Sequence, residues 1–541
     1  MTNQLRGPGQ HPAAASALTL ASLATCGVVR PYGPRALVGV GRALARWGTG
    51  LAGGYASLAA RTPNAVAIHD DLGSITFADL GAQANAFARA LSDLGVGEGD
   101  GVALMARNHR WFVITAIAVA RLGADVLYLN TAFSGPQVRE LLEREKPSAI
   151  VHDDEFSDVV ASAPSDAARV VAWADVPGPG TVGSLVSTRP GTDLPAPRRE
   201  GRSVILTSGT TGAPKGAARG SGSLSAGAAL LSRIPLRARM TVHVAAPLFH
   251  TWGWGHLNLA MLLGSTLVLR RRFTPRDFLD TLARTRSDAA VVIPVMLQRA
   301  LQLPKEELDS YDLSALTIVA ASGSSLPGDL ATAWMDQYGD NLYNTYGSTE
   351  CAWVTIAQPA EMRAHPGTAG APPIATVIAL YDTEGRPATG SSGRIFVRNG
   401  LPFEGYTHGG GKEVVDGLMS TGDVGTIRDG LLFVEGRDDE MIVSGGENVY
   451  PQEVENCLAR HPAVLEVAVV GVEDVDFGHR LLAWVALRPG HDLTEDDLKL
   501  HVRERLARYK VPREVRFLHE LPRNATGKIL KRRLTHTDES E

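Results

Sequence analysis

Cysteine is scarce in this sequence, which has Cys26, Cys351 and Cys457 as its three cysteines among 541 residues. Three distant cysteines cannot build a disulfide framework, and their spacing matches no paired zinc motif. Such sparse cysteine is typical of proteins from reducing compartments, so we expect a cytoplasmic protein.

An excess of basic residues is also lacking. The chain has 53 Lys+Arg against 58 Asp+Glu, a formal net charge of −5, which argues against a nucleic-acid footprint over the whole chain. Hydrophobic residues make up 44% and charged residues 21%, as in ordinary globular proteins. The length corresponds to about three or four domains of ordinary size. A chain of this length and composition can bury a large core, which excludes a fully disordered or fibrous protein.

Long, strongly apolar runs are missing near the N-terminus. Ala13–Val29 is uncharged but rich in Ala, Ser and Thr, and Arg6 alone charges the leading segment, so a signal peptide or a membrane span is disfavoured. Leu37–Leu58 mixes Leu and Val with arginine. It fits either an amphipathic helix on the inner face of a membrane or an extension that packs on the main body. We treat residues 1–54 as this extension.

Helix and strand signals alternate from about residue 64. Apolar residues at 4-3-4-3 spacing from Leu80 to Leu94 predict one buried helix face. Trp111–Leu122 is typical of a buried helix, and Pro136–Glu145 of a surface helix before the strand Ala149–His152. This order predicts an α/β fold with mainly parallel strands. The Pro- and Gly-rich stretch 176–202 is predicted to be a linker or a long surface crossing.

The pattern of predicted strands and helices changes after Gly436. Val464–Val472 and Leu481–Leu487 are typical of strands in a smaller unit, and Thr494 can cap a following helix. We therefore predict a large domain over residues 55–436, with parallel-rich sheets layered with helices, and a small α+β domain over residues 437–541.

A glycine- and hydroxyl-rich loop follows the predicted strand Val204–Leu206. Its candidate phosphate-binding residues are Thr207, Ser208, Gly209, Thr210, Thr211, Gly212 and Lys215. Glycines allow close approach of the backbone, successive amides form an anion-binding nest, and Lys215 adds a mobile positive charge. The spacing differs from a Walker A loop, and a merely flexible Gly/Ser loop would need no lysine. The loop predicts a polyphosphate site.

This loop resembles the signature of the adenylate-forming (AMP-binding) superfamily, which includes acyl-CoA synthetases. The run from Asn344 to Glu350 is a strong match to another motif of that superfamily. By the resemblance, Tyr346 with Gly347 contacts adenine, Thr349 contacts the α-phosphate, and Glu350 is a ligand of Mg²⁺. Aromatic stacking and a hard oxygen ligand suit those roles.

Two further segments match the superfamily's substrate pocket. Residues 246–255 resemble its acyl-pocket motif, which implies that His250 lies near the substrate carboxylate. A histidine among aromatic residues is also a common core residue. The turn with Ser322, Gly323 and Ser324 resembles the one that passes adenine and the acyl pocket, although a simple turn would look the same.

The remaining motifs lie in the C-terminal third. The resemblance implies that Asp423 and Arg437 bind the ribose and that Asp439 is the hinge between the two domains. It implies that Gly445 and Gly446 line the tunnel for the thiol, and that Lys528 is the catalytic lysine. A point charge on a mobile arm suits the last role.

These residues together predict an acyl-CoA synthetase that uses ATP, Mg²⁺ and CoA. A carboxylate would first be joined to AMP with release of pyrophosphate, and a thiol would then displace AMP. We expect a fatty acid as the substrate. The alternatives are a ligase that loads a carrier protein, a ligase for aryl or other non-fatty acids, a catalytically inactive nucleotide- or lipid-binding protein, and a P-loop ATPase. The sequence leaves a homodimer open.

Overall fold

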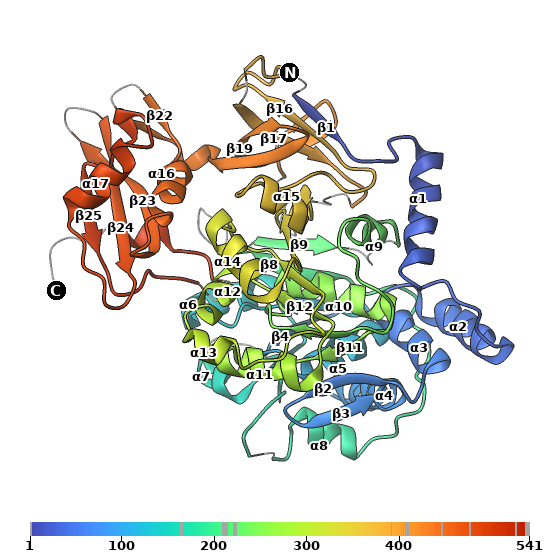
Figure 1. Cartoon of the computed structure of the whole chain (residues 1–541). Coiled ribbons are helices and arrows are strands. Elements are labelled where there is room, and N and C mark those ends of the chain that lie inside the picture. Colours follow the sequence, from blue (N-terminus) through green and yellow to red (C-terminus); the bar gives the residue numbers. More distant parts are fainter. Residues whose placement is uncertain are drawn as a thin grey trace.

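The computed structural model describes residues 3–162, 166–176, 178–207, 215–219, 224–390, 392–401, 403, 405, 411–444, 447–474, 478–524 and 527–535. A large α/β domain and a smaller C-terminal domain are visible in Figure 1, which confirms the predicted fold class. The described strands form four sheets.

The first sheet has the strand order β7-β6-β4-β5-β8-β9. Its strands are β4 (Gly101–Met105), β5 (Asp125–Tyr128), β6 (Ala149–His152), β7 (Ala168–Val171), β8 (Ser203–Thr207) and β9 (Lys215–Arg219). The pairs are parallel except β8 with β9. All residues of β5 and β6 are buried, as expected for parallel strands covered on both faces.

The second sheet has the order β15-β14-β13-β12-β10-β11-β2-β3. Its strands are β2 (Val66–Asp70), β3 (Gly73–Thr76), β10 (Thr241–Val244), β11 (Thr266–Val268), β12 (Ala289–Val292), β13 (Ile318–Ala321), β14 (Leu342–Tyr346) and β15 (Thr355–Ala357). Strands β10 and β12–β14 run parallel, so their carboxyl ends meet at one edge. Ligands of α/β proteins usually bind at such an edge.

Helices accompany these two sheets along the chain. They are α4 (Phe77–Asp93), α5 (Arg110–Arg121), α6 (Gly135–Glu145), α7 (Ser157–Ala161), α8 (Val182–Ser187), α9 (Leu224–Leu231), α10 (Thr251–Leu263), α11 (Pro275–Thr285), α12 (Pro294–Ala300), α13 (Lys305–Leu308), α14 (Gly328–Tyr338) and α15 (Pro359–Ala364). Thr76 and Asp79 form a capping box that starts α4, which buries Leu80 but leaves Leu94 44% exposed. The predicted apolar face therefore ends one turn early.

The third sheet is antiparallel, and the first strand of the chain forms one of its edges. It is built from β1 (Gln4–Arg6), β16 (Val377–Tyr381), β17 (Ser392–Arg398), β18 (Val414–Val415), β19 (Leu418–Arg428) and β20 (Leu431–Arg437). The pairing of β1 with β16 ties the N-terminal residues to a distant part of the sequence.

The N-terminal extension continues as three helices. They are α1 (Pro12–Thr25), α2 (Pro34–Trp47) and α3 (Leu51–Arg61). The predicted single stretch Leu37–Leu58 is thus two helices, separated around Gly48, whose φ of +73° suits glycine. Tyr55 and Leu58 of α3 are buried in the main core, whereas α2 lies at the rim of the molecule (Figure 1).

The small domain has its own sheet and core. Its strands are β21 (Ile442–Ser444), β22 (Glu447–Val449), β23 (Val464–Asp474), β24 (Gly478–Leu487) and β25 (Glu514–Phe517), accompanied by α16 (Pro451–Ala459) and α17 (Glu495–Arg503). Thr494 caps α17 through a capping box with Asp497. Among the residues described, no helix has the length and apolar character needed to cross a membrane.

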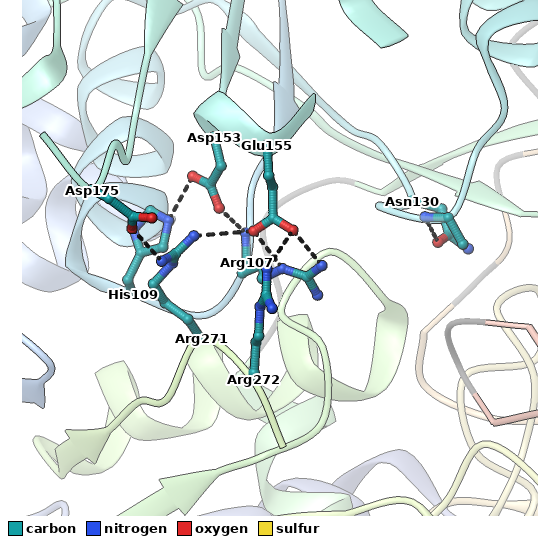
Figure 2. A network of polar contacts seen from close by, with 9 residues as sticks. Arg107, His109, Asn130, Asp153, Glu155, Asp175, Arg271 and Arg272 are labelled. Atoms are coloured by element: carbon teal, nitrogen blue, oxygen red, sulfur yellow. Dashed lines mark hydrogen bonds and ion pairs between the residues drawn. The ribbon is translucent and has the colours of Figure 1, made fainter. Parts of the chain in front are cut away.

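A polar network joins the first two sheets (Figure 2). Arg107, which follows β4, donates from Nε and Nη2 to the two carboxylate oxygens of Glu155 at 2.7 and 2.6 Å. Arg271 and Arg272, which follow β11, donate to the same carboxylate at 3.0 and 3.3 Å. The hydrogen bond from Arg107 is the main reason that the pKa of Glu155 is lowered. This carboxylate therefore holds three cations from two sheets.

Candidate active site

A cleft of about 2480 Å³ lies between the strand ends of the large domain and the small domain. Predicted site residues that line it are His250, Ser322, Gly323, Ser324, Tyr346, Gly347, Thr349, Asp423, Arg437 and Lys528. They come from segments almost 280 residues apart, which the fold brings to one place. Their individual roles remain predictions.

Parts of two predicted loops lie outside the described residues. These parts are Ser208, Gly209, Thr210, Thr211 and Gly212 of the phosphate loop, and Gly445 with Gly446 of the tunnel loop. Thr207 ends β8 and Lys215 begins β9, and the two residues face each other in the antiparallel register. The two strands that flank the phosphate loop therefore form an antiparallel pair.

Tyr346, at the end of β14, is joined to the predicted ribose anchor. Its hydroxyl donates to Oδ2 of Asp423 at 2.5 Å. Burial and the charge of Asp423 raise the pKa of Tyr346 well above its ordinary value, so the phenol stays a neutral donor. A Cβ on Gly347 would lie 2.1 Å from the carbonyl oxygen of Ala352, which explains the glycine after Tyr346.

Asn344 is a candidate that the motif contained but that we did not single out. Its side chain is 8% exposed and borders the cleft. Its Oδ1 accepts no hydrogen bond from any described residue. A buried amide oxygen without a donor is costly, so it suits a ligand that presents an N–H group, as the adenine amine does.

Arg437 connects the ribose anchor to the predicted hinge. It stands opposite Asp423 in the register of β19 and β20, with Nη1 3.7 Å from Oδ1 of that residue. Its Nε donates to Oδ1 of Asp439 at 2.9 Å. Burial raises the pKa of Asp423, and the charges of Arg437 and Lys528 counteract that rise. Lys528 and Asp423 both line the cleft.

The predicted phosphate contacts lie just beyond β14. The hydroxyl groups of Thr349 and Thr251 are 2.9 Å apart, and Ser348 donates to Oε2 of Glu350 at 3.0 Å. Thr251 and Ser348 have no distinctive spacing in the sequence, so their supporting role could not be predicted from it.

Glu350 has the chemistry expected of a magnesium ligand. The described residues contain no group of three or more His, Cys, Asp or Glu side chains arranged to hold a metal ion. Magnesium in nucleotide sites typically has one or two carboxylates, with phosphate oxygens and water as its other ligands. Glu350 does not itself line the cleft, but it directly follows Thr349, which does, and it would supply one carboxylate to a magnesium ion that arrives with ATP.

His250 is the residue before α10 and is half-buried at the cleft. Removal from water lowers the pKa of His250 to about 4, so its imidazole is neutral near pH 7. Trp252 also lines the cleft, and its Nε1 donates to the carbonyl of Val292 at 3.1 Å, whereas Trp254 lines a separate small cavity together with Leu51 and Ala52. His250 and Trp252 thus give the cleft a neutral polar group and an aromatic side chain.

The small domain is docked against α12 of the large domain. Gln298 donates to the carbonyl of Leu465 at 2.6 Å, and Arg299 donates to Glu520 at 2.6 Å. A Cβ on Gly527 would lie 2.6 Å from Val295, so the loop before Lys528 fits closely only with glycine there. Lys528 itself is exposed to the cleft.

Comparison with known proteins gives two family matches and a set of relatives. Residues 56–407 match the model for "AMP-binding enzyme", and residues 453–528 match "AMP-binding enzyme C-terminal domain". A feruloyl-CoA synthase from Amycolatopsis sp is 33% identical over 87% of this chain and 95% of that protein. An indoleacetate–CoA ligase from Aromatoleum aromaticum is 33% identical over 87% of this chain and 94% of its own length.

Fatty-acid enzymes and solved structures are also similar. A long-chain-fatty-acid–CoA ligase from Mycobacterium tuberculosis is 30% identical over 84% of this chain and 92% of its own length. The ATP-bound structure of MatB from Rhodopseudomonas palustris has a TM-score of 0.80 at 26% identity, and covers 90% of this chain and 99% of that one. These matches indicate ATP, Mg²⁺ and CoA as the cofactors and cosubstrates. The chain belongs to the adenylate-forming family of AMP-binding enzymes, in the branch of AMP-forming acid–CoA ligases.

Proposed function

We propose that this enzyme converts a fatty acid into its CoA thioester through an acyl-adenylate. The observation that carries the proposal is the cleft that Lys528 lines together with Asp423, which is hydrogen-bonded to Tyr346. A nucleotide held by its ribose at Asp423 would bring its phosphates within the reach of a mobile cation.

In the first step, a carboxylate oxygen of the acid attacks the α-phosphorus of ATP. The bond from that phosphorus to the bridging oxygen breaks, and pyrophosphate leaves with the electron pair. Lys528 stabilises the charge on the attacking side, while the loop from Thr207 to Lys215 holds the leaving phosphates. A bound magnesium ion at Glu350 supplies further positive charge there. The catalysis is positioning and electrostatic stabilisation.

In the second step, the sulfur of CoA attacks the acyl carbon, and the carbon–oxygen bond to AMP breaks. We propose that the small domain, residues 437–541, turns at Asp439 relative to residues 55–436. Lys528 then leaves the cleft, and the loop with Gly445 and Gly446 lines the path of the thiol. Arg437 supports this proposal, because it contacts both Asp439 and the ribose anchor Asp423. This is a hinge-type change between two poses.

An aromatic acid is a second candidate substrate. The names of two relatives, a feruloyl-CoA synthase and an indoleacetate–CoA ligase, favour it. The indole of Trp252, which lines the cleft, would suit a ring as well as an alkyl chain.

A screen of pyrophosphate release decides between these substrates. Straight-chain acids of graded length and a set of aryl acids are compared with ATP, with and without CoA. The proposal predicts that pyrophosphate release is fastest with an alkyl acid, and that an acyl-CoA forms when CoA is present. If pyrophosphate release were fastest with an aryl acid, the substrate would be an aromatic acid and not a fatty acid. Faster turnover with a phosphopantetheinylated carrier protein than with CoA would overturn the proposed acceptor.

A further inference from the structure

The N-terminal part of the chain has an unusual charge pattern. Residues 1–69 contain six arginines but no aspartate, glutamate or lysine, although the whole chain has a net charge of −5. This part spans β1 and α1–α3, and α2 lies at the rim of the molecule (Figure 1). Positive charge is thus concentrated in one segment of an acidic protein.

Helix α2 has one buried side and one exposed apolar side. Ala43 and Trp47 are buried. Leu37, Val38 and Leu44 are 54%, 53% and 38% exposed. At 100° per residue, the three exposed side chains span an arc of about 120°, in which Val38 lies opposite the buried pair and Leu44 is at the edge, about 60° from Trp47.

Two arginines complete this side of α2. Arg35 and Arg42 are exposed, and seven residues separate them, so they form one row beside Val38. We call Arg35, Leu37, Val38, Arg42 and Leu44 the α2 face. Two carboxylates of the main body reach this region at the C-terminal end of the helix. Asp193 is 3.8 Å from Arg46, and Glu200 accepts from the backbone N–H of Gly50.

We propose that the α2 face docks on the surface of an anionic lipid bilayer. Shallow insertion of Leu37, Val38 and Leu44 among the acyl chains would remove exposed apolar area from water, and the arginine row would face lipid phosphates. Charge complementarity favours this partner, because the extension carries no negative side chain of its own.

A second copy of the chain fits the α2 face less well. A stable dimer usually buries about 800 Å² on each partner, which one 14-residue helix that is already half covered hardly offers. Two copies meeting through this face would also bring arginine rows together. The proposal is independent of the proposed substrate, because none of these residues lines the cleft.

Sedimentation with lipid vesicles tests the proposal on the full-length enzyme. Phosphatidylcholine vesicles are compared with vesicles that also contain phosphatidylglycerol, at low and at high salt. We expect binding to the anionic vesicles that weakens at high salt. Arg35→Glu/Arg42→Glu should reduce this binding at least about tenfold, and Leu37→Ser/Val38→Ser should reduce it similarly.

Matched controls carry the same chemical changes elsewhere. Arg284→Glu/Arg503→Glu reverses two exposed charges at the ends of α11 and α17, and Leu72→Ser/Val176→Ser removes two exposed apolar side chains. Both controls should bind vesicles like the wild type. Pyrophosphate release with a water-soluble acid should be unchanged in all four variants, which separates this proposal from the proposed function.

Two results would overturn the docking proposal. One is equal binding of the α2-face variants and the wild type to anionic vesicles. The other is a wild-type dimer in sedimentation velocity that Leu37→Ser/Val38→Ser converts to monomer, while the vesicles bind no protein. In that second case, the α2 face would be an interface between copies.

Discussion

At the scale of single residues, the nucleotide end of the cleft depends on a chain of four side chains. Tyr346 donates to Asp423, and Arg437 lies between Asp423 and Asp439. The motifs named all four residues in advance. Their contacts were beyond sequence reasoning, because they depend on the pairing of β19 with β20 and on the approach of β14.

We predict that Tyr346→Phe weakens ATP binding more than it slows chemistry. The variant keeps the ring but removes the hydroxyl that orients Asp423. A hydrogen bond to a charged acceptor contributes about 1.5–3 kcal/mol, so the KM for ATP should rise by about tenfold or more. Pyrophosphate-release kinetics measure both parameters. Tyr343→Phe is the control on the same strand, and an unchanged KM in Tyr346→Phe would contradict the prediction.

Buried histidines make a prediction about pH. His243 and His256 are each 2% exposed, and burial lowers the pKa of both to about 4. The unfolded chain takes up these protons near pH 6.5, whereas the folded chain does so only near pH 4. The stabilising contribution of the two neutral histidines is therefore complete above pH 6.5 and is lost as the pH falls toward 4. Between pH 7 and 5 we expect the free energy of unfolding to fall by roughly 1–2 kcal/mol for each of these histidines.

Urea unfolding across this pH window is the measurement. Carboxylates whose pKa is lowered stay ionised in this window in both states, so they do not obscure the effect. His256→Met should show a flatter dependence than the wild type. Stability that stays constant or rises between pH 7 and 5 would contradict the prediction.

At the scale of helices and strands, local patterns predicted several elements of the large domain. The strand Ala149–His152 is β6, and the buried helix at Trp111–Leu122 is α5 shifted by one residue. The linker 176–202 contains the short helix α8, which has too few residues for a periodic signal. The pairing of β1 with β16 was also unpredictable, because three residues carry no pattern that identifies a distant partner.

The polar network between the first two sheets should contribute to stability. In Glu155→Gln, the cations Arg107, Arg271 and Arg272 lose their shared carboxylate and repel one another. We expect a loss of about 1–3 kcal/mol in the free energy of unfolding at pH 7. Because the folded pKa of Glu155 is lowered, this contribution is present above its ordinary value of 4.5 and is lost as pH falls below it.

Urea unfolding of Glu155→Gln and of the wild type at pH 7 and near pH 4 tests this. The difference between the two proteins should shrink at the lower pH. Glu306→Gln, at an exposed position, should behave like the wild type at both. A pH-independent difference would point to lost packing instead of lost charge.

At the scale of the whole molecule, the docked small domain is the central feature. Gln298 and Arg299 contact it, and Gly527 lies close to Val295. The sequence predicted a mobile unit with a lysine, but it could not predict where that unit docks. Docking depends on shape, and Gln298 and Arg299 are ordinary surface residues in any local pattern.

Gly527→Ala should hinder the docked pose selectively. Gly527 has a φ of +77°, and its added Cβ would lie 2.6 Å from Val295. We expect pyrophosphate release to slow at least about tenfold, because a 1 Å misplacement of a catalytic group can cost 100-fold. Thioester formation from supplied acyl-adenylate and CoA should be nearly unchanged. Gly490→Ala is the matched control, since its φ is +78° but open space surrounds the added atom. Equal effects in both variants would mean that backbone strain alone is responsible.

The most direct test of the account is the detection of acyl-AMP in the absence of CoA. Wild-type enzyme with ATP, magnesium and its acid should accumulate enzyme-bound acyl-AMP and an equal amount of pyrophosphate. Lys528→Ala should form less acyl-AMP by about a hundredfold or more while it still binds ATP, and Lys499→Ala, elsewhere in the small domain, should match the wild type. Rapid acid quench followed by mass spectrometry measures the adenylate. Acyl-AMP formed at the wild-type rate by Lys528→Ala, or ATP split by the wild type with no acyl-AMP, would contradict the account.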